Sequence, residues 1–149
     1  MRTFVFLFLL GGAAWPCFGE WVEKDPNVSH SLNGVAFGND IFVAVGDYGE
    51  ITYSSDDGEN WNRVHSGGDS FYAVAYGNGT FVAVGKDGRV CRSSNGTTWT
   101  DQSPISSETD LNGIAFGNGV FVAVGEDGHA YWSTGGASCL RFPLIPLGI

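Results

Sequence analysis

The chain has 149 residues, a length that suits one domain. Its 16 acidic side chains outnumber the 7 basic ones and give a formal net charge of −9 at pH 7. Such a surface repels phosphate groups, so the composition argues against a nucleic-acid-binding protein and against a binder of anionic membranes.

The first 19 residues have the layout of a secretory signal peptide. Arg2 gives a short basic start, residues 3–10 form an almost unbroken apolar run, and candidate cleavage points follow Ala14 and Gly19. The run is too short to span a bilayer, and the Trp-Pro pair before Cys17 is not the small-residue context of a lipid anchor. We therefore expect residues 1–19 to be a signal peptide and the protein to be secreted or to lie in the periplasm or cell envelope. The alternative is a buried N-terminal strand.

After this segment the sequence repeats itself. Residues 32–39 (LNGVAFGN) are matched by residues 71–78 (FYAVAYGN) and again by residues 111–118 (LNGIAFGN). A period of about 40 residues indicates a repeat architecture, in which each unit buries its apolar faces against its neighbours. We expect three repeats within residues 20–139, at about 32–70, 71–110 and 111–139. An atypical apolar tail follows at 140–149.

Each repeat predicts four strands separated by turn signals, and no helical period is present after residue 19. In the first copy the strands cover residues 32–38, 41–45, 50–54 and 61–64. The second strand reads Phe-Val-Ala-Val in every copy, and a strand that is apolar on both sides is buried on both sides. The first strands carry Gly or Ala at alternate positions, which suits strands crowded around an axis. Both features predict an all-β fold built from propeller blades.

A turn motif follows the third strand. Residues 54–61 read Ser-Ser-Asp-Asp-Gly-Glu-Asn-Trp and match the pattern Ser-x-Asp-x-Gly-x-x-Trp. The second copy, at 93–99, is one residue shorter and has Asn for Asp, and the third, at 133–139, has lost both the Asp and the Trp. On these motifs the chain resembles the BNR or Asp-box β-propellers, which include sialidases and photosystem II assembly-factor-like proteins.

The physical role expected of this Asp-box is local. Ser and Asp side chains hydrogen-bond a tight turn, Gly supplies a positive φ, and Trp covers the neighbouring sheet, so both tryptophans should be largely buried. The resemblance implies that the turn lies opposite the usual ligand face and that its residues are structural. These residues are Ser54, Asp56, Gly58, Trp61, Ser93, Gly96 and Trp99.

Three repeats do not close a ring, because propellers have ~4–8 blades. Trp21 precedes the first repeat at nearly the spacing with which Trp61 and Trp99 precede the next ones, so residues 20–26 are expected to form a leading outer strand. The third repeat, conversely, lacks a good fourth strand. The expected fold is therefore a propeller segment of three four-stranded blades.

Three explanations for the blade count stay open. Two chains can form a homodimer with a six-bladed ring, the chain can be a truncated piece of a longer propeller, or the repeats can form a β-trefoil. The abrupt apolar tail favours truncation. The doubly buried second strands and the Asp-box disfavour the trefoil.

The sequence gives little sign of catalysis. A sialidase-like enzyme needs an arginine cluster, a tyrosine nucleophile paired with a carboxylate and an acid/base aspartate, and no arginine here matches such a motif. The histidines are scattered without ligand spacing, so we expect no metal, and no motif indicates a cofactor. Cys91 and Cys139 fall at non-equivalent places, which disfavours a disulfide.

The turns between second and third strands vary on this constant scaffold. In propellers they share one face with the connections between repeats, where partners usually dock. The expected binding residues are Tyr48, Lys86, Arg89 and His129, unless these are ordinary solvated turn residues. The sequence thus predicts an exported, non-catalytic binding or scaffolding module for a protein or glycan. The alternatives are a fragment of a sialidase-like glycosidase and a truncated product without independent function.

Overall fold

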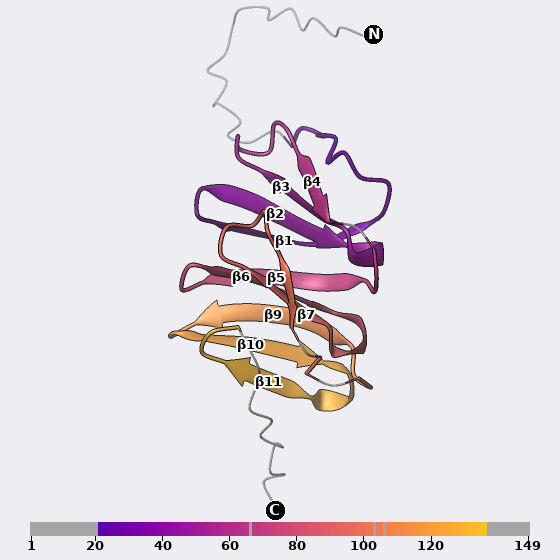
Figure 1. Ribbon diagram of the computed structural model, residues 1–149, viewed down its shortest axis with the longest axis vertical. Helices are drawn as coiled ribbons and strands as arrows, with labels where there is room; N and C mark the ends of the chain where they lie inside the picture. The colour runs from indigo at the N-terminus through magenta and orange to yellow at the C-terminus, as the bar shows by residue number, and fades with distance from the viewer. Residues whose placement is uncertain (1–20, 66, 103, 106, 137–149) are drawn as a thin grey trace, which may run out of the picture.

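A computed structural model describes residues 21–65, 67–102, 104–105 and 107–136. These residues form three antiparallel sheets that are stacked along the long axis of the molecule (Figure 1). We name the sheets blade 1, blade 2 and blade 3. Blade 1 contains β1 (Leu32–Gly38), β2 (Ile41–Gly46), β3 (Ile51–Ser54) and β4 (Asn62–His65), in that order across the sheet.

Blade 2 repeats this meander with β5 (Phe71–Gly77), β6 (Thr80–Gly85), β7 (Val90–Ser93) and β8 (Thr100–Gln102). Blade 3 contains β9 (Leu111–Gly117), β10 (Val120–Gly125) and β11 (Ala130–Ser133), and among the described residues it has no fourth strand. The all-β propeller-segment fold is thus confirmed. The β-trefoil alternative is wrong, because each repeat forms a separate sheet instead of contributing to one closed barrel.

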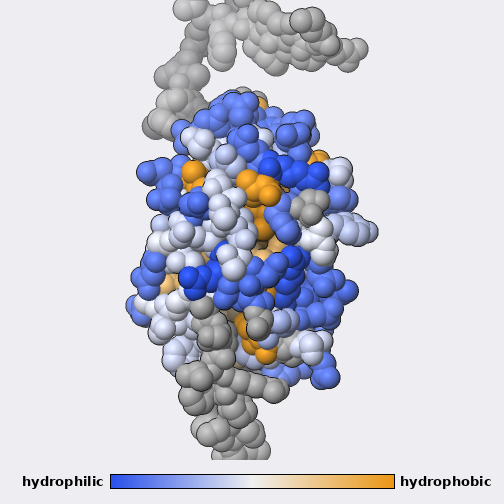
Figure 2. Space-filling view, in the orientation of Figure 1, coloured by the Kyte–Doolittle hydropathy of each residue, from blue (hydrophilic) through white to orange (hydrophobic). Residues whose placement is uncertain are grey.

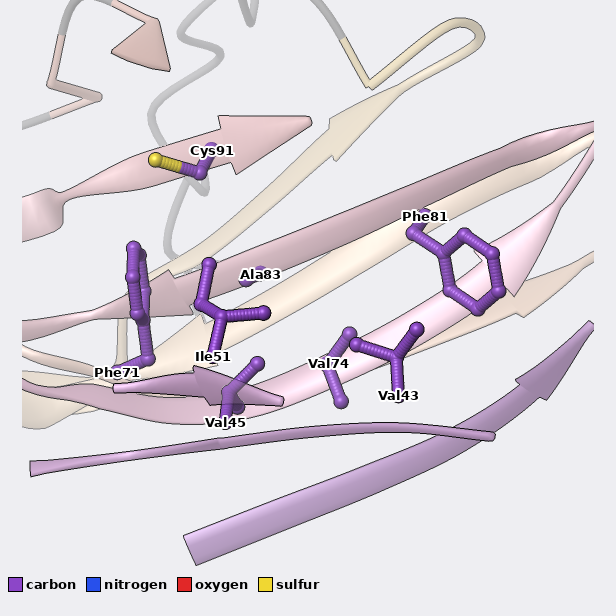
Figure 3. Packing of buried hydrophobic residues seen from close by; sticks show 8 residues of the cluster. All are labelled: Val43, Val45, Ile51, Phe71, Val74, Phe81, Ala83 and Cys91. Atoms are coloured by element: carbon purple, nitrogen blue, oxygen red, sulfur yellow. The ribbon is translucent and has the colours of Figure 1, made fainter. Parts of the chain in front are cut away.

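The middle blade explains why the second strands are apolar on both sides. Phe81 and Ala83 of β6 point into a core shared with blade 1, whereas Val82 and Val84 point into a core shared with blade 3. All four side chains are at most 2% exposed. Figure 3 shows the first of these cores, in which Val43 and Val45 of β2 face residues of blade 2. Burial of β6 on both faces is therefore confirmed.

The two end blades each have one open face. On β1, Val35 is 62% exposed and Phe37 is 55% exposed. On β10, Val122 and Val124 are 40% and 50% exposed. These apolar side chains lie on the faces where a further blade would pack, so the second strand of blade 3 is not buried on both sides as the sequence predicts.

The innermost strands lie side by side, and small residues permit this close approach. A Cβ added at Gly38 of β1 would strike the ring of Tyr76 on β5, and one added at Gly77 of β5 would strike the ring of Phe116 on β9. Each glycine thus accepts an aromatic ring of the next blade, as the prediction of crowded first strands requires.

The segment before β1 differs from the prediction. Residues 21–31 contain no strand, and Trp21 is fully exposed, so the described part of 20–26 is not the leading outer strand that the spacing predicts. A strand needs a sheet edge beside it, and blade 3, the sheet without a fourth strand, lies at the other end of the stack. The segment instead crosses blade 1, where Thr52 Oγ1 donates to the carbonyl of Pro26 at 3.4 Å.

Several predictions from the sequence lie outside the described residues, namely the signal peptide at 1–19, the tail at 140–149 and Cys139. Cys91 is buried and unpaired. Helical structure in the described ranges is limited to short 3₁₀ turns, none of which has the length or apolarity to cross a membrane.

Candidate functional site

The predicted binding residues fall on three corresponding turns, one in each blade. These are η1 (Asp47–Gly49), η2 (Lys86–Gly88) and η3 (Glu126–Gly128). The central residue of each turn is left-handed, with φ values of 55° at Tyr48, 52° at Asp87 and 54° at Asp127. The same backbone shape therefore presents Tyr in blade 1 and Asp in blades 2 and 3. We call this row of turns the turn face.

Hydrogen bonds fix the first two turns to the connections that lead into the next blade. The backbone N–H of Gly67 donates to Tyr48 O at 2.7 Å, and the Tyr48 N–H donates to Ser70 Oγ at 3.3 Å. In blade 2 the Asp87 N–H donates to Asp110 Oδ1 at 2.9 Å. Each contact joins one blade to the start of the next, so the turn face is a braced surface.

Tyr48 is the most exposed aromatic of the turn face, with 64% of its surface accessible. Its ring lies 4.7 Å from that of His30, centroid to centroid, at a tilted angle of 44°. His30 Nδ1 is 3.1 Å from Glu50 Oε2. The two rings make an aromatic shelf above a buried carboxylate, which suits stacking against an apolar or planar group.

Lys86 begins the second turn and is flanked by carboxylates. Its Nζ is 3.5 Å from Asp69 Oδ1 and 3.6 Å from Asp87 Oδ2. The nearby charges of Asp87 and then Asp69 raise the pKa of Lys86 above its usual value. The ammonium group therefore stays charged, but it is already balanced by its neighbours.

Arg89 is turned into the blade and not toward a partner. Its side chain is 16% exposed, its Nη2 is 3.2 Å from Asp101 Oδ1, and its guanidinium carbon lies 4.4 Å from the centre of the Phe71 ring. Nη1 also donates to the carbonyl of Asp69. The guanidinium is thus held by contacts within blade 2 and its connection, which gives Arg89 a structural role.

His129 completes the row on blade 3 and is exposed. Its ring stacks on that of Tyr131 at 6.1 Å with an interplanar angle of 12°, and its Nδ1 lies 3.1 Å from the carbonyl oxygen of Glu126. The turn face therefore keeps three accessible predicted residues, Tyr48, Lys86 and His129, one per blade. Among the hydrogen bonds, ion pairs and ring contacts of the described residues, none joins two of these three side chains.

Acidic side chains outnumber cations on the turn face. Asp69 and Asp87 flank Lys86, Asp47 lies in the turn of blade 1, and Glu126 and Asp127 lie in the turn of blade 3. Among the described residues no group of three or more His, Cys, Asp or Glu side chains is arranged to hold a metal ion. The acids are spread along the row, which suits an extended cationic ligand better than a single ion.

The sequence did not single out Glu50 as a site residue. Its side chain is fully buried and accepts hydrogen bonds from Arg63 Nε and, at 2.8 Å, from Arg63 Nη2. Arg63 lies on β4, and Glu50 directly precedes β3. A comparison of the repeats could have pointed to Glu50, because one repeat position is ionisable in all three copies: Glu50, Arg89 and His129.

The Asp-box turns lie at the opposite ends of the strands. Ser54 Oγ receives the Gly58 N–H at 3.0 Å, Asp56 receives the backbone and side-chain N–H groups of Asn60, and Trp61 Nε1 donates to Gly58 O at 3.1 Å. In blade 2, Ser93 receives the Gly96 N–H, and Trp99 donates to Gly96 O, both at 2.8 Å. These bonds all serve the turns themselves. Both tryptophans are partly buried, and the indole N–H of each lies over the turn.

One open groove lies on blade 1, with a volume of about 630 Å³. The segment before β1 forms one wall through Val22 and Pro26, and Val35 and Ala44 of blade 1 form the other. Figure 2 shows a mostly hydrophilic surface that is interrupted by small hydrophobic patches. The groove belongs to the open face of blade 1 and not to the turn face.

No family model and no curated protein matches this chain. Solved β-propellers do. The WD40 propeller domain of Doa1 matches with a TM-score of 0.58 and 18% identity, over 72% of this chain and 38% of that one. YCF48 from Cyanidioschyzon merolae matches with a TM-score of 0.61 and 21% identity, over 74% and 36%. A structure of YCF48 bound to D1 peptide matches with a TM-score of 0.56 and 18% identity, over 74% and 38%. These matches show the propeller fold, and the chain spans well under half of each of these propellers.

Proposed function

We propose that this chain is an exported, non-catalytic propeller module that binds a cationic peptide segment of a partner protein on the turn face. The observation that carries the proposal is the row of three corresponding turns, the first two braced by hydrogen bonds, with exposed side chains at Tyr48, Lys86 and His129. A rigid scaffold with variable tips is the usual construction of a binding surface.

The charge of the turn face supports the choice of a peptide with basic residues. Two carboxylates flank Lys86, and the turns of blades 1 and 3 add Asp47, Glu126 and Asp127, so the face attracts positive charge. The Tyr48–His30 shelf offers a second type of contact for an aromatic or apolar side chain of the same segment. The likeness to YCF48, which has been solved with a D1 peptide, supports a peptide as the first ligand class to test.

The non-catalytic part of the proposal is supported by the contacts of two arginines. Arg63 and Arg89 each pair with a carboxylate inside a different blade. They are therefore engaged in stabilising their sheets and do not converge on a substrate carboxylate, as a sialidase-like site requires.

A displayed library of random peptides and an array of neutral and sialylated glycans test the proposal. We expect the purified protein to retain peptides enriched in Lys and Arg, with affinity that falls as salt rises. Tyr48→Ala and Asp127→Asn should each weaken the retained peptides at least several-fold. Thr98→Ala, at an exposed position on the opposite Asp-box end, is the matched control and should leave binding unchanged.

Two outcomes contradict the proposal. Retention of glycans alone would identify a different ligand class, and peptide binding that is equally strong in the turn-face variants would place the site elsewhere. Export is tested separately, by sequencing the N-terminus of the protein recovered from the medium or cell envelope.

A further inference from the structure

We propose that a second copy of this chain closes the arc, with blade 3 of one copy packed on blade 1 of the other at both junctions. This inference does not depend on the proposed function, because it concerns the end faces and not the turn face. It rests on two kinds of contact that occur at both junctions between neighbouring blades. At each end of the chain, one partner of each contact is present without the other.

The first repeated contact joins a glycine to an aromatic ring of the next blade. Gly38 lies under Tyr76, and Gly77 lies under Phe116, and both glycines are buried. The corresponding glycine of blade 3, Gly117, is exposed and has open space where a Cβ would lie.

The missing ring for this contact is present at the other end of the chain. Phe37 of β1 corresponds to Tyr76 and Phe116, yet it is 55% exposed, because no other blade of the described residues packs on this face of blade 1. Phe37 of a second copy therefore fits on Gly117.

The second repeated contact joins a valine of one blade to the Asp-box glycine of the next. The space beyond Gly96 is filled by side chains of blade 1 that include Val43, and the space beyond Gly136 is filled by Val82. At the ends, Val122 is 40% exposed, and Gly58 has nothing within 4 Å of an added Cβ. Val122 and Gly58 thus lack their partners within the chain. A contact between them would join blade 3 of one copy to blade 1 of another, as the contact between Gly117 and Phe37 does.

The apolar faces around these contacts match as well. Val45 and Val84 are at most 1% exposed against the next blade, whereas Val124 at the same position of blade 3 is 50% exposed. On the other side, Val74 is 7% exposed against the preceding blade, and the corresponding Val35 is 62% exposed. Contact between the two end faces would bury both valines.

The described part of blade 3 has no fourth strand. The hydroxyl of Tyr131 is buried and has no hydrogen-bond partner among the described residues. Cys91, at the corresponding position of blade 2, donates to Asp101 of the fourth strand at 2.7 Å.

Two copies are the number that gives a closed propeller ring. Head-to-tail contacts give a ring when the rotation closes and an open filament when it does not. Propellers have ~4–8 blades, and six is the one multiple of three in that range. The assembly is therefore a twofold ring of six blades.

Sedimentation equilibrium on the purified chain tests the ring directly, and we expect a single species with twice the monomer mass. Gly117→Leu should convert it to a monomer with an unchanged far-ultraviolet circular dichroism spectrum, because the single chain has room for the new side chain. Ser94→Leu adds the same side chain at an exposed position of the middle blade and should leave the dimer intact. A monomeric wild type, a dimer that Gly117→Leu does not disturb, or a polydisperse series of longer assemblies would each overturn the proposal.

A cross-link gives a second, independent measurement. Phe37→Cys combined with Gly117→Cys should form a disulfide-linked dimer on a non-reducing gel, whereas neither single variant should. Formation of the cross-link only within one chain, or no cross-link in a protein that sediments as a dimer, would contradict the head-to-tail arrangement.

Discussion

Glu50 and Arg89 occupy the same position in blades 1 and 2 and carry opposite charges, and each is matched by the opposite charge on the fourth strand of its own blade. Glu50 pairs with Arg63, and Arg89 pairs with Asp101. Arg63 lies across from Thr52 and Asp101 lies across from Cys91, which are corresponding positions in the two sheets. The two blades therefore tie their third and fourth strands with the same ion pair in opposite polarity.

This relationship predicts the effect of breaking the pair in blade 1. Arg63→Ala leaves the fully buried Glu50 carboxylate with His30 as its remaining side-chain partner. Loss of one member of a buried pair costs about 3–5 kcal/mol, and we expect about 3 kcal/mol because the Arg63 side chain is 40% exposed. Denaturant unfolding measures the change.

The opposite polarity of blade 2 supplies the control for that experiment. The double variant Glu50→Arg with Arg63→Asp copies blade 2 and should be more stable than either single variant. Lys24→Ala removes an exposed pair with Glu59 and should cost only about 0–1 kcal/mol. Equal losses in Arg63→Ala and Lys24→Ala would contradict a structural role for the buried pair.

Cys91 should be an unreactive thiol that makes the fold sensitive to alkali. Burial, followed by the hydrogen bond to Asp101, raises the pKa of Cys91 to about 12. The thiol should therefore resist iodoacetamide at pH 8 in the folded protein, as peptide mapping by mass spectrometry can show.

The sign of the pH effect follows from the same shift. A raised pKa means that the folded state holds the proton more tightly, so this contribution to stability is complete below pH 9 and is lost as the pH rises toward 12. Cys91→Val keeps the apolar contacts and removes the titration. Its melting temperature should fall less than that of the wild type between pH 9 and 11, and equal falls would show that other groups cause the alkaline loss.

The two Asp-box tryptophans should differ in their contribution to stability. Trp99 packs against the core between blades 1 and 2, with its ring centroid 6.3 Å from that of Phe81, whereas Trp61 lines the open groove of blade 1. Trp99→Ala should cost about 3 kcal/mol, the lower end of the range for a buried aromatic. Trp61→Ala should cost about 1–2 kcal/mol, because less apolar area is involved. Thermal melts of the two variants would contradict this account if Trp61→Ala were the more damaging.

Asp56 should make the stability of the protein depend on pH in the acid range. Hydrogen bonds from Asn60 and Ser54 lower the pKa of Asp56. Its contribution to the stability of the folded state is therefore present above the ordinary carboxyl range and is lost as the pH falls through the lowered pKa. Asp56→Asn copies Asn95 of the second box, which receives the Thr97 and Thr98 N–H groups. The variant should lose less stability than the wild type between pH 5 and 2, as acid titration followed by circular dichroism can show.

The fold could be predicted from the sequence because the repeats carry it. The Phe-Val-Ala-Val strands predicted burial on both faces, and β6 confirms it through Phe81 and Val82, which enter different cores. The leading strand at Trp21 could not be predicted correctly, because spacing shows which repeat position a segment occupies but not whether a sheet edge lies beside it.

The site could be predicted only in part. Repeat alignment placed Tyr48, Lys86 and His129 on one face, since turns at one end of corresponding strands lie in a row. It could not show that Arg89 turns inward, because this depends on the register of β7 with β8, and the two Asp-boxes differ in length by one residue. The charge of Asp101 becomes informative only once that register is known.

The placing of alternate β6 residues in two separate cores has a consequence for the order in which the protein opens. In a linear array each unit is held only by its neighbours, so a unit with two neighbours is released last. In the monomeric Gly117→Leu variant, where blades 1 and 3 each have one neighbour, amides of β6 should therefore exchange with deuterium most slowly, those of β2 and β10 faster, and the gradient should run outward from the centre in both directions. In a single chain, blade 1 and blade 3 would then unfold locally and independently of each other, while blade 2 stays folded.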